Sequence, residues 1–179
     1  MIQGRKKKAL YRAFLRAARR RDAAGITELI VHHPELHDYS GREGGLVWFL
    51  GSNAPELLEA AFKAGLSPDS GDILPFLHRA TAEGNREWVQ LALQYGADLE
   101  KRNSDGETAL GYAVAYMHLD ILRMLLDAGA DVNGIETPED GSRNTPLDLC
   151  GERPEKRELA ELLRSVGGKT YSELIPPKA

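Results

Sequence analysis

The chain has 179 residues and a formal net charge of −4, and hydrophobic residues make up 42% of it. This length fits one domain, and the hydrophobic content is that of a globular protein, not of a disordered or fibrous one. No apolar run approaches the roughly 20 residues that a membrane-spanning helix needs, so we expect no membrane contact. The single cysteine, Cys150, excludes an internal disulfide and agrees with a reducing compartment, which predicts a cytoplasmic protein.

The first 21 residues are strongly basic. They carry nine of the 23 arginine and lysine residues and no acid, so this segment has a charge of +9 and residues 22–179 have −13. No apolar segment of signal-peptide type follows. Three interpretations stay open: a solvated capping helix with a loose basic arm, a contact with nucleic acid or another acidic surface, and a contact with the acidic remainder of the chain. Aromatic residues are sparse there, so we assign no nucleic-acid site to this segment.

Three histidines surround Pro34, namely His32, His33 and His37. Zinc binding would need further ligands, and no cysteine or other histidine stands nearby at a ligand spacing. The segment reads as the end of a helix, where a protonated imidazole is favoured by the negative end of the helix dipole. We therefore predict no metal site and no bound cofactor.

Two stretches repeat with a spacing of 33 residues, Pro75 to Glu100 and Thr108 to Asn133. The second stretch contains two short helical patterns separated by Met117-His118-Leu119. Thr108 is placed to cap the first helix, and Gly129 stands where a left-handed C-cap requires a residue without Cβ. Helices this short cannot bury their apolar faces alone, so the unit must stack on copies of itself. The residues predicted to face the core are Leu110, Ala113, Val114, Ile121, Leu122, Leu125 and Leu126.

The stretch from Thr145 to Thr170 follows the same pattern after a step of 37 residues, so about four residues are inserted within 134–144. Cys150 then takes the place of Ala113, which predicts a buried packing role rather than a reactive thiol. The stretch ends in Gly167-Gly168-Lys169-Thr170, the end of a phosphate-loop pattern. That pattern needs a glycine where Leu163 stands and a preceding strand where a helix is predicted, so we predict no nucleotide site. Since no nucleophile stands beside a base in a recognisable motif, we predict no enzyme activity.

The repeated pattern resembles the ankyrin repeat. The residues that carry the resemblance are the openings Pro75-Phe76-Leu77-His78 and Thr145-Pro146-Leu147-Asp148, with Gly-Ala-Asp at 96–98 and 129–131. The resemblance implies an all-α solenoid of helix-turn-helix units with short finger loops, and a structural hydrogen bond from His78.

Imposing this register on the N-terminal half of the chain reveals two weaker copies, within Arg12–Leu36 and Gly44–Asp69. With them, we predict a basic arm at residues 1–9, an ankyrin-repeat domain at 10–172 and a tail at 173–179. The predicted repeat units are 10–41, 42–72, 73–105, 106–142 and 143–172.

The resemblance also implies a binding surface, because ankyrin proteins bind other proteins through a concave groove formed by finger loops and the exposed sides of first helices. The stack holds such positions rigidly, so little ordering entropy is lost on binding. Trp48 has a second interpretation, filling a gap between neighbouring first helices, whereas we expect Tyr116 to be exposed and Trp88 to pack on the convex side. The predicted groove residues are Arg16, Arg19, Arg20, Trp48, Arg79, Glu83, Asp105, Glu107, Tyr112 and Tyr116. In the last repeat the same offsets give Leu149, Glu152 and Arg153, although Pro154 shifts that register.

The predicted function is that of a protein-binding module. We favour a stoichiometric inhibitor of one partner, for example an immunity protein to a toxin enzyme, because one groove takes up almost the whole chain. The alternative is an adaptor or effector scaffold that bridges two proteins. The net negative charge of residues 22–179 suits a basic partner and would speed its capture by long-range attraction. We expect a monomer that binds neither nucleic acid nor membrane.

Overall fold

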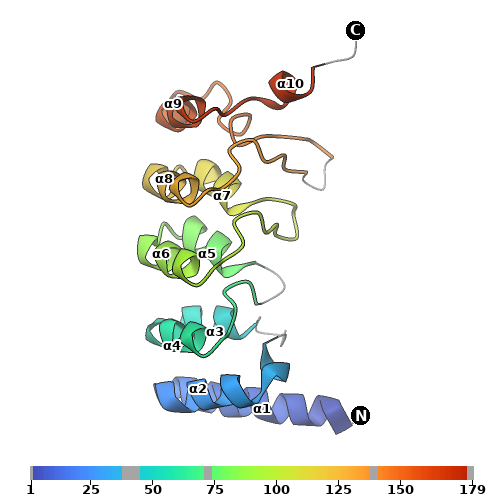
Figure 1. The fold of residues 1–179 in the computed structure, drawn as a ribbon, viewed down its shortest axis with the longest axis vertical. Coiled ribbons are helices and arrows are strands. Elements are labelled where there is room, and N and C mark those ends of the chain that lie inside the picture. Colours follow the sequence, from blue (N-terminus) through green and yellow to red (C-terminus); the bar gives the residue numbers. More distant parts are fainter. Residues whose placement is uncertain (1, 38–44, 71–73, 138–140, 177–179) are drawn as a thin grey trace. The chain divides into compact units, whose positions relative to one another are not determined.

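The computed structural model describes residues 2–37, 45–70, 74–137 and 141–176, with side chains from Lys6 onward (Figure 1). Over these ranges the chain is helical, and the extended backbone is limited to one isolated bridge between Glu136 and Asn144. The helices are α1 (Ile2–Arg19), α2 (Ala23–His32), α3 (Leu46–Asn53), α4 (Leu58–Lys63), α5 (Phe76–Ala82), α6 (Arg86–Gln94), α7 (Ala109–Ala115), α8 (Leu119–Asp127), α9 (Arg157–Ser165) and α10 (Tyr171–Leu174). Three short 3-10 turns cover Pro34–Leu36, Pro55–Leu57 and Pro154–Lys156.

No helix within the described ranges is both long enough and apolar enough to span a membrane. The chain divides into two compact units, which are described separately below. One comprises Met1–Phe76 with Gln94–Ala97, and the other comprises Leu77–Leu93 with Asp98–Ala179. The repeat boundaries predicted at 41/42 and 72/73 fall outside the described residues.

In the first unit, α1 packs against α2 and α3, and α2 packs against α4. The fully buried side chains at this centre include Phe14, Ile26, Ile30, Leu50 and Leu58. Helix α1 begins at Ile2, so residues 2–9 of the segment expected to form a basic arm continue the first helix of the first repeat. The reason is local, because lysine, arginine, alanine and leucine favour helix and no proline interrupts them.

Arg21 connects the first two repeats of this unit. It adopts a left-handed conformation, with φ of 58°, in the turn between α1 and α2. Its guanidinium donates a hydrogen bond to the Asn53 carbonyl oxygen at 2.6 Å and forms an ion pair with Glu56 at 2.7 Å. A side chain in the turn of one helix pair is thereby anchored on the next pair.

In the second unit, α8 packs against α7 and α9. Six of the seven predicted core residues of the central repeat are buried, and Leu126 is half-buried. The Thr108 hydroxyl caps α7 by accepting a hydrogen bond from the Gly111 N–H, and Gly129 has a φ of 99°, as predicted. Local sequence chemistry therefore accounts for the boundaries of this helix pair.

The last repeat differs from the pattern of the others, because residues 146–151 form turns instead of a first helix. Gly151 has a φ of 57°, and Pro154 cannot donate the hydrogen bond that a continuing helix requires. The register of Leu149, Glu152 and Arg153, which the repeat pattern assigned to the groove, is consequently not helical. Cys150 is buried, as predicted from its alignment with Ala113.

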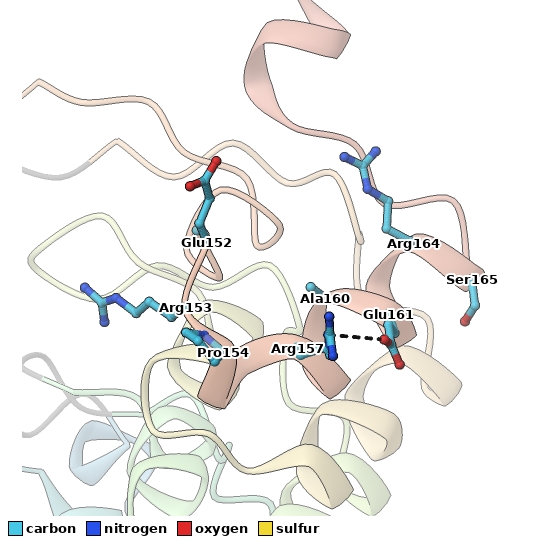
Figure 2. Close-up of a pocket in the computed structure, with 9 residues that line it drawn as sticks. Glu152, Arg153, Pro154, Arg157, Ala160, Glu161, Arg164 and Ser165 are labelled. Atoms are coloured by element: carbon cyan, nitrogen blue, oxygen red, sulfur yellow. Dashed lines mark ion pairs between the residues drawn. The ribbon is translucent and has the colours of Figure 1, made fainter.

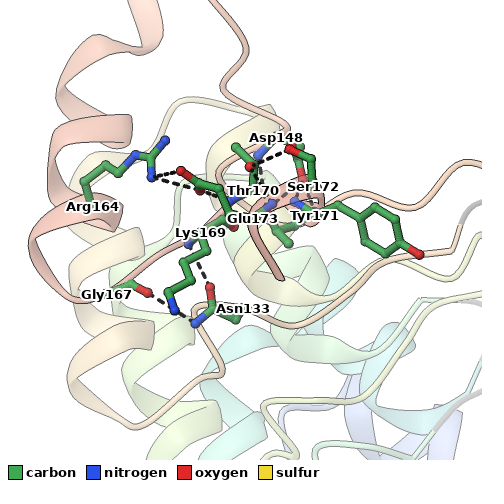
Figure 3. Close-up of polar contacts among 10 residues, drawn as sticks. Asn133, Asp148, Arg164, Gly167, Lys169, Thr170, Tyr171, Ser172 and Glu173 are labelled. Atoms are coloured by element: carbon green, nitrogen blue, oxygen red, sulfur yellow. Dashed lines mark hydrogen bonds and ion pairs between the residues drawn. The ribbon is translucent and has the colours of Figure 1, made fainter. Parts of the chain in front are cut away.

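A polar network holds the C-terminal helix α10 against the last repeat (Figure 3). Asp148 Oδ2 accepts hydrogen bonds from the backbone N–H groups of Thr145 at 2.9 Å and Tyr171 at 2.7 Å. Arg164 contacts both carboxylate oxygens of Glu173 at 2.9 Å, and Thr170 forms a capping box with Glu173. Residues 173–174 of the predicted tail are therefore part of a docked helix.

The same segment contains the residues that looked like a phosphate loop. The Asn133 side chain accepts a hydrogen bond from the Lys169 N–H at 2.8 Å and donates one to the Gly167 carbonyl oxygen at 3.2 Å. Helix α9 precedes the segment, as expected, where a phosphate loop would need a strand. The backbone of the segment therefore closes the last repeat.

The docking of α10 is expected to be lost in acid. Hydrogen bonding to the Thr170 N–H and the contact with Arg164 lower the pKa of Glu173 to about 2. A carboxyl group with a lowered pKa in the folded state stabilises that state above its ordinary pKa and loses this effect as the pH falls through the lowered value. The amide resonance of Thr170 should therefore titrate near pH 2 in NMR spectra, and the titration should disappear in Glu173→Gln. Titration of Thr170 near 4.5 would contradict the network.

Candidate protein-binding surface

Two tyrosines lie one turn apart on the side of α7 that is not used for core packing. Tyr116 is 52% exposed, as expected, and Tyr112 is half-buried, with 5.7 Å between their ring centroids. His78 meets Tyr112 edge-on at 5.4 Å, and the ring of His118 lies parallel to that of Tyr116 at 6.4 Å. These four residues form a succession of rings, which we call the aromatic row. It begins at the buried His78, passes through Tyr112 and the exposed Tyr116, and ends at the half-buried His118.

His78 fixes the buried end of the aromatic row. Its Nε2–H donates a hydrogen bond to the Glu107 carbonyl oxygen at 2.9 Å, which confirms the structural role expected for this histidine. Burial lowers the pKa of His78, and the hydrogen bond to Glu107 opposes that effect only in part. The imidazole is therefore neutral at neutral pH and contributes a fixed hydrogen bond.

Asn103 shapes the finger loop that precedes α7. Its Oδ1 accepts hydrogen bonds from the N–H groups of Asp105 and Glu107, both at 2.9 Å. Its Nδ2 donates to the Tyr112 hydroxyl at 3.0 Å and to Glu107 Oε2 at 3.1 Å. One amide side chain therefore positions three predicted binding residues. Asn103 was not among the predicted residues, although an asparagine just before Asp105-Gly106 is typical of a side chain that forms hydrogen bonds within its own turn.

The surface around Tyr112 is negatively charged. Burial raises the pKa of the Tyr112 hydroxyl, the hydrogen bond from Asn103 lowers it, and the charges of Glu107 and Asp105 raise it further. Among the ion pairs of the described residues, none involves Asp105 or Glu107. The central repeat thus presents exposed aromatic rings beside two carboxylates that lack a cationic partner in the described part of the chain.

The turn between α7 and α8 adds an exposed methionine to this surface. Met117 has a φ of 61° and is 51% exposed, whereas the equivalent residue 33 positions earlier is Gly84, with a φ of 67°. A left-handed conformation costs a non-glycine residue on the order of 1 kcal/mol. His118 occupies the space above Gly84, where an added Cβ would lie 2.9 Å from the His118 ring. Neither Met117 nor His118 was predicted as a surface residue.

Arg79 and Glu83 occupy the positions of Tyr112 and Tyr116 in the preceding repeat. Arg79 forms an ion pair with Glu83 at 2.7 Å, and its guanidinium lies over the Trp88 ring, 5.4 Å from the ring centroid. Only 12% of the Arg79 side chain is exposed, against 44% for Glu83. Trp88 lies on α6 and is half-buried. Much of the Arg79 side chain is thus occupied within its own repeat.

The first unit contains the other predicted binding residues. Trp48, on α3, is 41% exposed. Arg16, Arg19 and Arg20 are exposed at the C-terminal end of α1. Within this unit the predicted surface is basic and aromatic, and the role of these residues in binding remains a prediction.

Comparison with known proteins identifies the family of the chain. A family model described as ankyrin repeats (3 copies) matches residues 49–136 and residues 77–170, which together cover more than half of the chain. The chain belongs to the ankyrin-repeat family. Its expected fold class, an all-α solenoid of helix-turn-helix units, is confirmed, and ankyrin repeats are protein-binding modules.

Three relatives illustrate the range of ankyrin proteins that this chain resembles. It is 40% identical over 93 residues to human protein phosphatase 1 regulatory subunit 27, covering 52% of this chain and 56% of that protein. The mouse protein of the same name is 37% identical over the same length, with the same coverage. The NF-kappa-B inhibitor cactus of Drosophila melanogaster is 38% identical over 78 residues, covering 42% of this chain and 15% of that protein. The chain thus spans little more than half the length of the first two relatives.

The central ankyrin repeat lacks the histidine of the repeat before it, since Gly111 stands 33 residues after His78. The side chain of Glu136 occupies that space and is 2% exposed. Its Oε1 accepts hydrogen bonds from the Thr108 N–H at 2.9 Å and the Thr108 hydroxyl at 2.8 Å. A Cβ on Gly111 would collide with this oxygen, so the glutamate at 136 requires a glycine at 111.

Glu136 should make stability depend on pH in the direction opposite to Glu173. Burial raises the pKa of Glu136, and its hydrogen bonds to Thr108 oppose this only in part. The folded state therefore binds a proton more readily than the unfolded state, so the free energy of unfolding falls as the pH rises from about 4.5 through the raised pKa. Glu136→Gln cannot ionise, so the wild type should lose stability relative to this variant as the pH rises above about 4.5 in urea titrations. A pH-independent difference would contradict the burial of an ionisable group.

The last ankyrin repeat contains an open cavity of about 790 Å³ (Figure 2). Arginines and glutamates alternate along its walls, and Arg157 and Glu161 approach each other to 3.9 Å. Residues Glu152 and Arg153, assigned to the groove by the repeat pattern, line this cavity instead of a helix face. The mixed charges are typical of a solvated surface, and ion pairs this exposed contribute little stability.

Proposed function

We propose that this ankyrin-repeat protein is a stoichiometric inhibitor of one protein partner, which it binds through the exposed sides of its first helices. The observation that carries the proposal is the aromatic row, in which Tyr116 is exposed and the neighbouring Tyr112 lies close to the carboxylates of Asp105 and Glu107, which meet no cation among the described ion pairs. Tyrosine, tryptophan and arginine dominate interface energies when a partner covers them. Two similar proteins are named as a phosphatase regulatory subunit and as an inhibitor, and these names support a regulatory binding function.

The charge of the chain favours a basic partner. Residues 22–179 carry a net charge of −13, which would attract a basic protein and speed its capture at low salt. An immunity protein that silences a toxin enzyme is one example of such an inhibitor. We propose a cytoplasmic monomer without cofactor, in agreement with the single buried cysteine.

Affinity purification from the native host, followed by an activity assay of the captured protein, tests this proposal. We expect one basic protein whose activity is abolished at a one-to-one ratio. A single partner that stays fully active when bound would contradict inhibition and leave only the binding role.

An adaptor that bridges two proteins is the second candidate, and helix α1 favours it. Four exposed cations recur on one face at helical spacing, with no ion-pair partner among the described residues: Lys8, Arg12, Arg16 and Arg19. This face would suit an acidic surface different from the basic partner of the aromatic row. Recovery of two proteins bound together, one of them released by Arg12→Glu, would establish the adaptor.

A further inference from the structure

The aromatic row offers a site for one particular kind of side chain. Tyr116 exposes half of its surface, and the ring of Tyr112 lies 5.7 Å from it. The faces of tyrosine rings attract cations, with a strength that increases when the pair is removed from water. The exposed Tyr116 ring, with the half-buried Tyr112 ring beside it, can receive an aliphatic, aromatic or cationic side chain on shape alone, so the choice depends on charge.

The charge next to these rings selects a cation. Asp105 is exposed, Glu107 is half-buried, and among the described ion pairs neither meets a cation. Asn103 holds both residues in place through the hydrogen bonds that their N–H groups donate to its Oδ1. Asn103 Nδ2 also donates to Glu107 Oε2 at 3.1 Å and to the Tyr112 hydroxyl at 3.0 Å. The Glu107 carboxylate is therefore held close to the Tyr112 ring before any partner arrives, which reduces the entropy lost when a cation binds.

The preceding repeat contains the complete arrangement within one chain. There the Arg79 guanidinium lies over the Trp88 ring, 5.4 Å from its centroid, while Glu83 binds it at 2.7 Å. The central repeat has rings and carboxylates, but Tyr112 replaces the arginine. A planar guanidinium suits such a site better than an ammonium, because it stacks on rings and binds carboxylates through two N–H groups at once.

We propose that the rings of Tyr112 and Tyr116 receive an arginine side chain of the bound protein, whose charge the carboxylates of Asp105 and Glu107 neutralise. This inference rests on the proposed function, since it names the contact by which a basic partner is recognised. A partner that presents arginine should consequently bind more tightly than an equally charged partner that presents lysine.

Nona-arginine and nona-lysine peptides are suitable probes of the full-length protein, with binding measured by NMR titration at about 150 mM salt. Nona-arginine should shift the ring resonances of Tyr112 and Tyr116 and bind about 5-fold more tightly than nona-lysine. Tyr116→Leu should weaken nona-arginine binding by about 5- to 20-fold, and Tyr116→Phe, which keeps the ring, should stay within about twofold of the wild type. Both changes are at an exposed position, so circular dichroism should show an unchanged fold.

A matched pair of substitutions separates the site from general attraction to the acidic chain. Asp105→Asn and Asp127→Asn each remove one carboxylate, from the finger loop and from the last residue of α8 respectively. The first should weaken nona-arginine binding by about threefold and the second should leave it unchanged. Equal losses from both, or undiminished binding by Tyr116→Leu, would overturn the inference.

A further experiment distinguishes failure of the arginine contact from failure of the proposed inhibitor function. A captured partner that is inhibited and loses affinity on Tyr116→Ala, but whose binding survives replacement of each of its interface arginines by methionine, would overturn the arginine contact alone. The inhibitor function would then be retained, with Tyr116 making a different contact with the partner.

Discussion

Replacing Phe14 with alanine should lower the free energy of unfolding by about 3–5 kcal/mol, the largest loss of stability that we expect from a single substitution. Phe14 is fully buried on α1, and the substitution would leave a cavity that close-packed neighbours cannot refill. The size of this effect depends on the first repeat being an integral part of the folded array. Urea unfolding followed by circular dichroism measures the change, with the slope of the transition as a test of cooperativity.

Arg12→Ala is the matched control, because it alters an exposed position on the same helix and should change stability by less than about 0.5 kcal/mol. A loss below about 1 kcal/mol for Phe14→Ala would show that the first repeat unfolds separately from the rest. In that case α1 would be an appendage of the array.

Gly111→Ala should destabilise the protein by about 2 kcal/mol, although the same change in an ordinary helix stabilises by about 1 kcal/mol. The new Cβ would collide with Glu136 Oε1 and displace the carboxylate that binds Thr108. Thr108 is 4% exposed, so its N–H would then lack both water and a partner. The sign of the effect therefore distinguishes the close approach from simple helix propensity.

A double-mutant cycle tests the dependence of Gly111 on Glu136. Glu136→Ala alone should also cost about 2 kcal/mol, because it removes the acceptor of the Thr108 hydrogen bonds. The double variant should cost much less than the two single changes together, since the clash no longer exists once the carboxylate is gone. Thr137→Ala, at the exposed neighbouring position, should have almost no effect. Additive losses would mean that the two sites act independently.

These residues also illustrate which parts of the fold a sequence can predict. Thr108 and Gly129 act on backbone groups within one or two turns, so their caps could be read from the local pattern. Glu136 binds Thr108 across 28 residues, and its role depends on the stacking of one repeat on the next. No local pattern distinguishes such a buried carboxylate from a solvated one.

The predicted binding residues show the same division. The repeat register placed Tyr116 on the exposed side of α7 correctly, because helical periodicity decides which side faces the core. The register could not reveal that Arg79 lies over Trp88, since this contact depends on rotamers of two different helices. Asn103 and Met117 escaped notice because their roles come from loop hydrogen bonds and a left-handed turn. Periodicity therefore predicts the exposed face of a helix better than it predicts which side chains remain available there.

The most direct test of the binding surface is the affinity of a captured partner for alanine variants, measured by isothermal titration calorimetry. Trp48→Ala, Tyr112→Ala and Tyr116→Ala, made one at a time, should weaken binding by about 1–3 kcal/mol for at least one of the three. Glu161→Ala, at an exposed position of α9, should leave the affinity nearly unchanged. A partner that binds all three aromatic variants as tightly as the wild type would contradict the account and place the binding site elsewhere.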